Sequence, residues 1–261
     1  RLASAHIAPL LAFTVADWQL DQRACVENIQ RRLPSAPWIV RSSCGREDSA
    51  QASFAGAFLS VPNVDEAGLV SAIEQVIASY GDVHLTDEIL IQPMLGNVLR
   101  SGVAFSHDPN TCAPYRVVNW SEGDDTAAVT GGMGGRLWQQ AAHSAVAAPA
   151  SLAPVVALLE ELLSLFGDRP VDCEFAVTRD AEGETLWLLQ ARPLILPTAP
   201  ESAATQFARL QSIQSKVERG MRPHPFLIGQ RTVYGVMPDW NPAEIIGIRP
   251  KPLALSLYRD L

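Results

Sequence analysis

Two carboxylates, an amide and a guanidinium lie in two short segments that can each form a strand. In the segment VDCEFAV, Asp172 and Glu174 alternate with apolar residues, and in TLWLLQARP the polar residues are Gln190 and Arg192. Because side chains two residues apart point to the same face of a strand, each pair shares one face. The sequence RDAEGE between the segments predicts the turn of a hairpin.

If the two strands pair with these faces together, the hairpin presents all four polar side chains on one side. The opposite side would then be packed by Cys173, Phe175, Trp187 and Leu189. Glu174 and the carbonyl oxygen of Gln190 are hard ligands that suit Mg²⁺ when substrate phosphates complete its shell. Arg192 can hold a phosphate by two hydrogen bonds. The alternative is a polar sheet face on which Glu174 and Arg192 form a salt bridge.

A further cation, Arg41, comes at the end of another predicted strand, over residues 38–42, whose first residues are the apolar WIV. Two serines follow it. A phosphate ligand would satisfy the charge of Arg41, since a guanidinium binds phosphate oxygens in a two-pronged geometry. The alternative is an ion pair with the nearby Glu47 or Asp48.

Other motifs carry less chemical information. Gly56 and the residues AFLSVPNV after it would form a loop over which a phosphate could lie. The run TGGMGG at 130–135 lacks the lysine of a P-loop and the spacing of a dinucleotide fingerprint. His107 and His224 have no serine, cysteine or acid at a spacing that predicts a catalytic triad, so we expect both to be structural.

The composition narrows the class of protein. The chain has 261 residues, 48% hydrophobic and 18% charged, which is typical of a globular protein with a sizeable core. A net charge of −8 argues against nucleic-acid binding, which needs a basic face. There is no run of about 18 apolar residues and hence no predicted membrane span. The four cysteines are not spaced as CxxC, and we expect a cytoplasmic protein with reduced thiols.

Helix and strand patterns are mixed without regular alternation. Amphipathic spacing predicts helices over 65–80 and 151–166, and a further helix over 201–219. A strand-rich block lies between the first two helices, and the hairpin follows the second. This order favours an α+β fold over a doubly wound sheet.

Three segments together resemble the nucleotide-binding domain of the phosphoenolpyruvate synthase and pyruvate phosphate dikinase family. VRSSCGREDSAQASFAGAF resembles a signature of the form V-R-S-S, E-D and S-x-A-G. ILIQPMLGNVLRSGVAFSHDP resembles a second, and DCEFAV followed by LWLLQARP a third. They occur in family order across residues 38–197.

The resemblance implies an ATP-grasp-like α+β domain with mixed or antiparallel sheets and flanking helices, in which the nucleotide lies between two subdomains. It divides the chain into an N-terminal segment, 1–37, a nucleotide-binding core, 38–197, and a helical and proline-rich extension, 198–261. Because the chain opens on Arg1, we expect it to be a piece of a longer protein.

The resemblance also implies roles for residues in the first two signatures. Arg41 would contact the phosphates of ATP. Gly56 and Ser60 would lie on the phosphate loop, although the family usually has a threonine where Ser60 stands. Gln92 would lie near the adenine or the ribose.

In the third signature, Glu174 and Gln190 would hold Mg²⁺, and Arg192 would hold a phosphate. Arg41 and Arg192 are thereby the catalytic candidates. The implied activity is phosphoryl or pyrophosphoryl transfer from MgATP to a histidine on a separate phosphocarrier domain, which lies outside this chain.

Departures from the family pattern keep other functions open. The family usually has a lysine near the nucleotide in a longer N-terminal segment, whereas the first lysine here is Lys216. Arg46 stands where the family usually has a small residue. A nucleotide-binding module without phosphotransfer is therefore the alternative, and a structural domain that binds no nucleotide is a third possibility.

Overall fold

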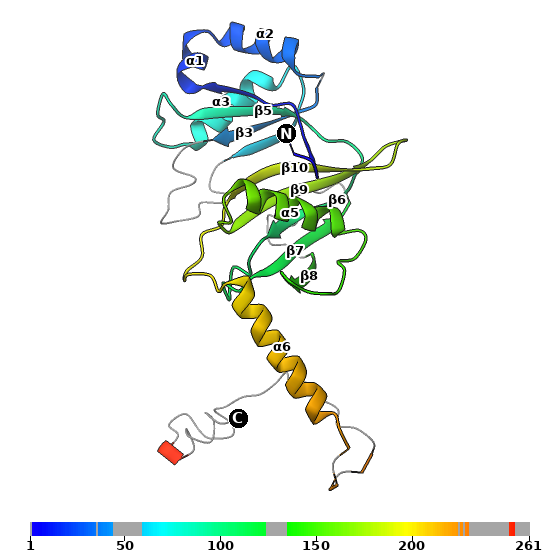
Figure 1. The fold of residues 1–261 in the computed structure, drawn as a ribbon. Coiled ribbons are helices and arrows are strands. Elements are labelled where there is room, and N and C mark those ends of the chain that lie inside the picture. Colours follow the sequence, from blue (N-terminus) through cyan, green and yellow to red (C-terminus); the bar gives the residue numbers. More distant parts are fainter. Residues whose placement is uncertain are drawn as a thin grey trace. The chain divides into compact units, whose positions relative to one another are not determined.

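The computed structural model describes residues 2–34, 36–43, 59–123, 135–223, 225–226, 228–229 and 251–253. The chain divides into two compact units, residues 1–206 and 207–261. The first unit holds two β-sheets and the helices that cover them (Figure 1).

The smaller sheet has four strands, and all of its pairs are antiparallel. Their order is β2 (Leu11–Thr14), β5 (Glu88–Pro93), β3 (Trp38–Ser43) and β4 (Ser60–Val64). The helices of this part are α1 (Val15–Leu20), α2 (Gln22–Arg32) and α3 (Leu69–Ser79). Residues 11–32 therefore fold together with the strands that carry the first signature.

Alternation along β3 gives this sheet one apolar face. Trp38 and Val40 are buried, whereas Ile39 and Arg41 are only partly covered. The buried pair packs in one cluster with residues such as Ile73 of α3, so α3 covers that face. The opposite face carries Arg41.

The larger sheet has six strands and is mixed. Their order is β1 (His6–Ile7), β10 (Glu184–Pro193), β9 (Val171–Arg179), β6 (Val98–Phe105), β7 (Tyr115–Glu122) and β8 (Arg136–Ala141). The short β1 runs parallel to β10, and the other pairs are antiparallel. Residues near the N-terminus thus pair with a strand that lies about 180 residues later in the chain.

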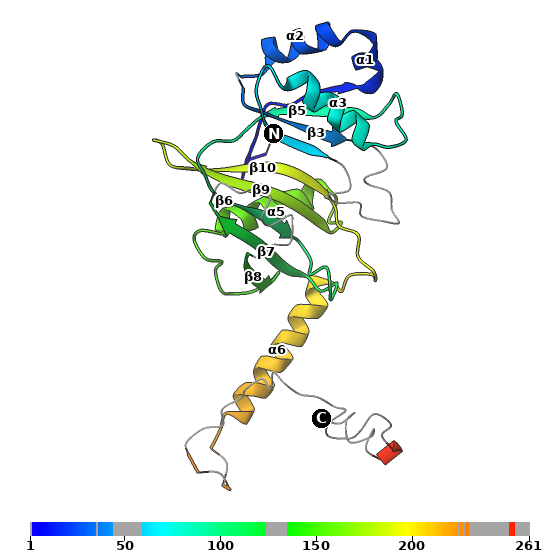
Figure 2. The same cartoon turned by 180° about the vertical axis from the view of Figure 1, so that it is seen from behind.

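The helix α5 (Ala153–Leu165) covers one face of the larger sheet (Figure 2). Its Leu158 and Leu159 are fully buried in a cluster with Phe175 of β9. The backbone N–H groups of Ala3 and Ser4 donate to the carboxylate of Glu161 in α5, which ties the N-terminal segment to the helix.

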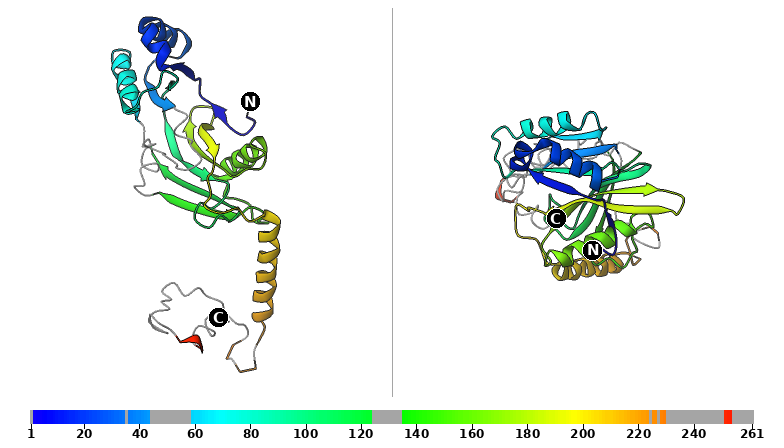
Figure 3. Two further views of the ribbon diagram at one scale, coloured as in Figure 1. Left: turned by 90° about the vertical axis from the view of Figure 1, so that its left-hand side faces the viewer. Right: turned by 90° about the horizontal axis from the view of Figure 1, so that it is seen from above.

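The right-hand view of Figure 3 shows α3 and α5 on opposite sides with strands between them. The α+β class is confirmed, with one mixed sheet, one antiparallel sheet and flanking helices. Two sheets that carry their helices on outer faces agree with the ATP-grasp-like arrangement that the resemblance implies. The remaining helix, α6, spans Ala203–Gly220. Within the described part of the chain, none of the helices has the length and apolar character needed to span a membrane.

Candidate functional site

The β9–β10 hairpin brings the predicted polar side chains onto one face. In its antiparallel register Glu174 lies opposite Gln190, and Asp172 lies opposite Arg192. Side chains of directly opposed residues lie on the same side of the sheet. The predicted common face of two carboxylates, an amide and a guanidinium is therefore confirmed.

A β-bulge in β10 changes which residues of this strand lie on the apolar face of the hairpin. The register shifts between Leu188 and Gln190, so that Leu189 is skipped. One extra residue reverses the alternation, and Trp187 therefore lies on the polar side, where its Nε1 donates to Thr178 Oγ1 at 2.9 Å. The prediction that Trp187 packs on the side of Cys173 is wrong. Leu186 and Leu188 take those core positions.

Arg192 is held by a carboxylate from the neighbouring strand. Its Nε donates to the two oxygens of Asp172 at 3.0 and 3.1 Å, and its Nη2 donates to Oδ2 at 3.0 Å. Both side chains are mostly buried, with 26% of Arg192 and 12% of Asp172 exposed. A salt bridge on this face does form, and Asp172 supplies its carboxylate. Asp172 thus fixes the orientation of a guanidinium proposed to contact phosphate.

The smaller sheet contributes three more predicted site residues on one face. Arg41 of β3 lies opposite Ser60 of β4. Gln92 of β5 lies opposite Ile39, which shares its face with Arg41. All three therefore lie on the face turned away from the apolar cluster around Val40. Ser60 is exposed, and Gln92 is partly buried.

Arg41 joins the two sheets. Its Nη2 donates to Glu174 Oε2 at 3.4 Å and to Gln190 Oε1 at 3.3 Å. The exposed fractions of the Arg41 and Glu174 side chains are 21% and 29%, so the contact is partly open to solvent. The face of the smaller sheet that carries Arg41 thus meets the polar face of the hairpin.

Other residues of the expected site fall outside the described residues. They include Gly56, the alternative partners Glu47 and Asp48, and most of the glycine run at 130–135. His224 is also outside. His107 lies in a local network in which its Nδ1 is 3.0 Å from Ser106 Oγ. Burial and the charge of Arg116 hold the pKa of His107 below its usual value, so a neutral ring is favoured there.

The described side chains offer oxygen ligands for only one kind of metal site. In the described ranges no group of three or more histidine, cysteine, aspartate or glutamate side chains is arranged to hold a metal ion. Glu174 and Gln190 supply one carboxylate and one amide oxygen on neighbouring strands. Such a pair fits Mg²⁺ that shares its remaining positions with phosphate oxygens and water, and does not fit a cage made by the protein alone.

The strand beneath these polar groups is strongly desolvated. Burial raises the pKa of the Cys173 thiol to about 12, and the charges of Asp172 and Glu174 add to the shift. The carboxylates therefore border an apolar interior on one side and partly exposed surface on the other.

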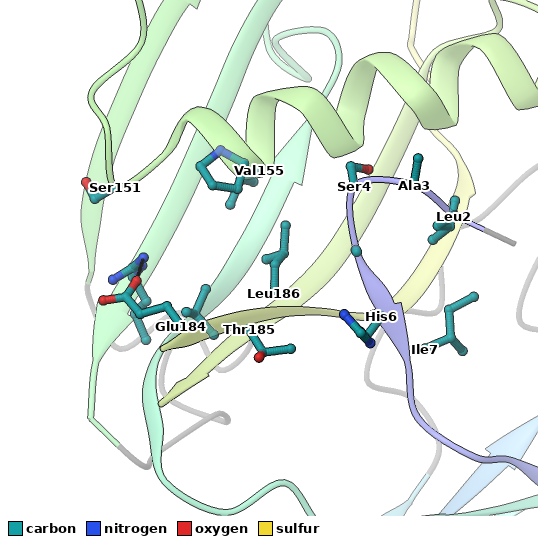
Figure 4. A pocket seen from close by; sticks show the side chains of 14 residues that line it. Leu2, Ala3, Ser4, His6, Ile7, Ser151, Val155, Glu184, Thr185 and Leu186 are labelled. Atoms are coloured by element: carbon teal, nitrogen blue, oxygen red, sulfur yellow. Dashed lines mark hydrogen bonds and ion pairs between the residues drawn. The ribbon is translucent and has the colours of Figure 1, made fainter. Parts of the chain in front are cut away.

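A separate cavity of about 570 Å³ lies on the α5 side of the larger sheet. It lies between residues 2–7, the start of α5 and the end of the hairpin (Figure 4). Glu184, ion-paired with Arg100 at 2.6 Å, lies at one end, and His6 lies at the other. None of the predicted site residues that the structure describes lines this cavity.

A comparison with solved structures finds matches of low sequence identity and with TM-scores below 0.5. D-alanine–D-alanine ligase from Helicobacter pylori is 14% identical, with 80% of this chain and 56% of that chain covered and a TM-score of 0.41. D-alanyl-alanine synthetase A from Vibrio cholerae is 13% identical, with 78% and 56% covered and a TM-score of 0.40. The biotin carboxylase domain of 2-oxoglutarate carboxylase from Hydrogenobacter thermophilus is 12% identical, with 75% and 38% covered and a TM-score of 0.42. The chain spans less than two thirds of the length of each.

No curated protein matches the sequence. Residues 19–84 match the family model described as the AMP/ATP-binding domain of pyruvate phosphate dikinase. This segment includes β3 and β4, and thus Arg41 and Ser60. The family resemblance is confirmed over residues 19–84, a segment similar to the AMP/ATP-binding domain of pyruvate phosphate dikinase.

Proposed function

We propose that this chain binds MgATP between the polar faces of its two sheets. The observation that carries the proposal is the contact of Arg41, from one sheet, with Glu174 and Gln190, from the other. It brings the first and third signatures together at one place, although they lie 133 residues apart. The match over residues 19–84 supports nucleotide binding independently of this contact.

The triphosphate would be held by the two arginines. Arg41 and Arg192 would each donate hydrogen bonds to phosphate oxygens, and Asp172 would keep Arg192 in position. Glu174 and Gln190 would hold Mg²⁺, which neutralises phosphate charge when it is bound.

The remaining contacts would come from the smaller sheet and its loop. Gln92 would contact the adenine or the ribose, and Gly56 and Ser60 would line the phosphates. Ser60 lies opposite Arg41, so its hydroxyl and the guanidinium can approach the same group.

We further propose that the bound ATP serves phosphoryl or pyrophosphoryl transfer to a histidine on a separate domain, within a longer ATP-dependent phosphotransferase of the dikinase type. Catalysis in such transfers consists mainly of positioning and charge neutralisation, which arginines and a metal ion can supply. A nucleotide-binding module without transfer is the second candidate, since the sequence has no lysine before Lys216.

The binding proposal is tested by thermal unfolding with MgATP. At a hundredfold excess of ligand over its dissociation constant, binding stabilises a protein by about 2.7 kcal/mol. We expect the melting temperature to rise and EDTA to remove most of the rise. Glu174→Gln should weaken MgATP binding about tenfold to hundredfold. Glu27→Gln changes a carboxylate of an exposed ion pair with Arg23 on α2, so it is the matched control and should bind like the wild type.

A flat melting temperature up to millimolar MgATP would contradict the binding proposal. The transfer proposal needs a separate measurement, namely product analysis with labelled ATP. We expect this chain alone to form neither AMP nor a stable phosphohistidine, because a separated acceptor reacts very slowly. AMP should appear once the phosphocarrier domain and its acceptor are present. If a longer protein that contains this chain leaves ATP unchanged with each acceptor tested, the second candidate, a nucleotide-binding module without transfer, would be favoured.

A further inference from the structure

A single nitrogen of Arg41 lies between two oxygens from different strands. Nη2 is 3.4 Å from Glu174 Oε2 and 3.3 Å from Gln190 Oε1. These two oxygens are the ones to which the proposed function assigns the metal ion. A positively charged N–H group therefore contacts the same pair of oxygen atoms that a divalent cation would use.

The contacts of Arg41 are looser than those of the other arginine on this face. Charge-assisted N–H···O bonds are typically about 2.7–2.9 Å long. Both contacts of Arg41 are well beyond this range, whereas the three bonds of Arg192 to Asp172 measure 3.0–3.1 Å. The two arginines are similarly exposed, but 29% of Glu174 is exposed against 12% of Asp172. An ion pair whose carboxylate is open to solvent contributes little to stability. The Arg41 contact is thus the easier of the two to exchange.

Among the described residues, each of the two carboxylates on this face forms an ion pair with an arginine. Asp172 is matched by the guanidinium of Arg192, which belongs to the same hairpin. Glu174 is matched by Arg41, which comes from the other sheet. Within the described ranges, Arg41 is the cation that is ion-paired with Glu174. If Arg41 leaves, this carboxylate loses that partner, and a metal cation is a group that can replace it.

We propose that Arg41 is an exchangeable counter-ion of the metal site, which competes with the divalent cation for Glu174 and Gln190. This inference rests on the proposed function and describes how the binding of metal and the binding of nucleotide are coupled. When metal and triphosphate bind together, the phosphates offer the displaced guanidinium a new partner. Metal and nucleotide therefore bind cooperatively, and the metal alone binds weakly.

Arg41→Met tests the proposal because it removes the charge and keeps an unbranched apolar side chain. The probe is Mn²⁺ alone, followed by electron paramagnetic resonance of the free ion without nucleotide. We expect the affinity for Mn²⁺ to rise about twofold to fivefold, the factor that corresponds to the loss of a weak competing ion pair. The affinity for MgATP, measured by calorimetry, should fall about tenfold or more.

The opposite signs of these two changes separate competition from a merely structural role, which would lower both affinities. Arg23→Met, which removes an exposed arginine paired with Glu27, is the matched control and should change neither. Arg41→Lys keeps a charge but loses the guanidinium geometry, so its Mn²⁺ affinity should lie between the wild type and Arg41→Met. This variant also serves if Arg41→Met does not fold.

An unchanged or lowered Mn²⁺ affinity in both Arg41 variants, with weakened MgATP binding, would overturn the competition and leave the proposed function standing. A wild-type protein that binds no MgATP would overturn the proposed function itself. Glu174→Gln should abolish the binding of Mn²⁺, so that the signal of the free ion stays at full strength. Binding that persists in this variant would show that the metal binds elsewhere.

Discussion

The two faces of the β9–β10 hairpin are built from alternate residues of the same strands, yet they differ in almost every physical respect. On the α5 side, Cys173, Phe175 and Val177 are at most 4% exposed and pack in one apolar cluster. On the other side, Asp172 and Glu174 form ion pairs with arginines. One face thus packs into the apolar core, and the other carries charged groups paired with arginines.

This difference predicts that substitutions on the two faces have separable effects. Burying a large apolar side chain contributes about 1.5–3 kcal/mol to stability. A partly exposed ion pair contributes about 0–1 kcal/mol. Changes on the α5 side should therefore lower the free energy of unfolding, and changes on the polar side should mainly alter ligand binding.

The largest expected effect is that of Phe175→Ala. Its ring is completely buried against α5, and truncation of a buried phenylalanine typically costs about 3–5 kcal/mol because it leaves a cavity. Urea denaturation should show this loss of stability without ligand. The protein that remains folded should still be stabilised by MgATP, since no atom of the polar face is removed.

Leu165→Ala is the matched control for this experiment. Leu165 is the last residue of α5 and is 66% exposed, so its truncation should change stability by no more than about 0.5 kcal/mol. If Phe175→Ala abolished the MgATP effect while costing little stability, the separation of the two faces would be wrong.

A smaller effect is expected for the Arg192–Asp172 pair, which lies on the polar face but is mostly buried. Arg192→Ala should weaken triphosphate binding by about 1.5–3 kcal/mol, the value of a charge-assisted hydrogen bond, and should affect adenosine binding less. Asp172→Ala should weaken triphosphate binding too, because it releases Arg192 from its fixed orientation.

A double-mutant cycle, with calorimetry of ATP and of adenosine, measures how far these two residues act as one unit. If Asp172 acts only by positioning Arg192, the double variant should bind ATP no more weakly than Arg192→Ala alone. Additive losses would instead indicate that Asp172 contacts the ligand independently. A loss of stability without ligand, and none in binding, would indicate a purely structural salt bridge.

The local parts of this picture could be predicted from the sequence. Alternation places Glu174 and Asp172 on one face whatever the rest of the fold is, and the register of the hairpin agrees. The bulge at Leu189 could not be predicted, because the residues of a bulged strand have the same types as those of a regular strand. It moved Trp187 to the other face.

The contacts between segments that lie far apart in the chain could not be predicted from the sequence pattern either. Nothing in the spacing of residues indicates that Arg41 reaches Glu174, since this depends on how two sheets meet. The nearby acidic residues were the obvious local candidates for Arg41. The family resemblance assigned both residues to one ligand without showing that they touch. Asp172 was placed on the correct face, but its pairing with Arg192 depends on the register of opposite strands.

The smallest effect concerns the pH dependence of stability on the buried side. Burial raises the pKa of the Cys173 thiol to about 12, above the value of about 9 for an exposed thiol. Between these values the unfolded chain loses the proton and the folded chain keeps it. Fewer protons are then bound in the unfolded state, so the free energy of unfolding falls as the pH rises.

The full stabilisation is present below pH 9 and is lost progressively toward pH 12. Each pH unit in this window costs about 1.4 kcal/mol. Tyrosines and other cysteines titrate in the same range, so the informative quantity is the difference between the wild type and Cys173→Ala. Raising the pH from 8 to 10 should destabilise the wild type by about 1.4 kcal/mol more than the variant in urea denaturation. Parallel losses in the two proteins would mean that the thiol is more accessible to water than its position under α5 implies. In that case water would reach the apolar face of the hairpin as well as its charged face.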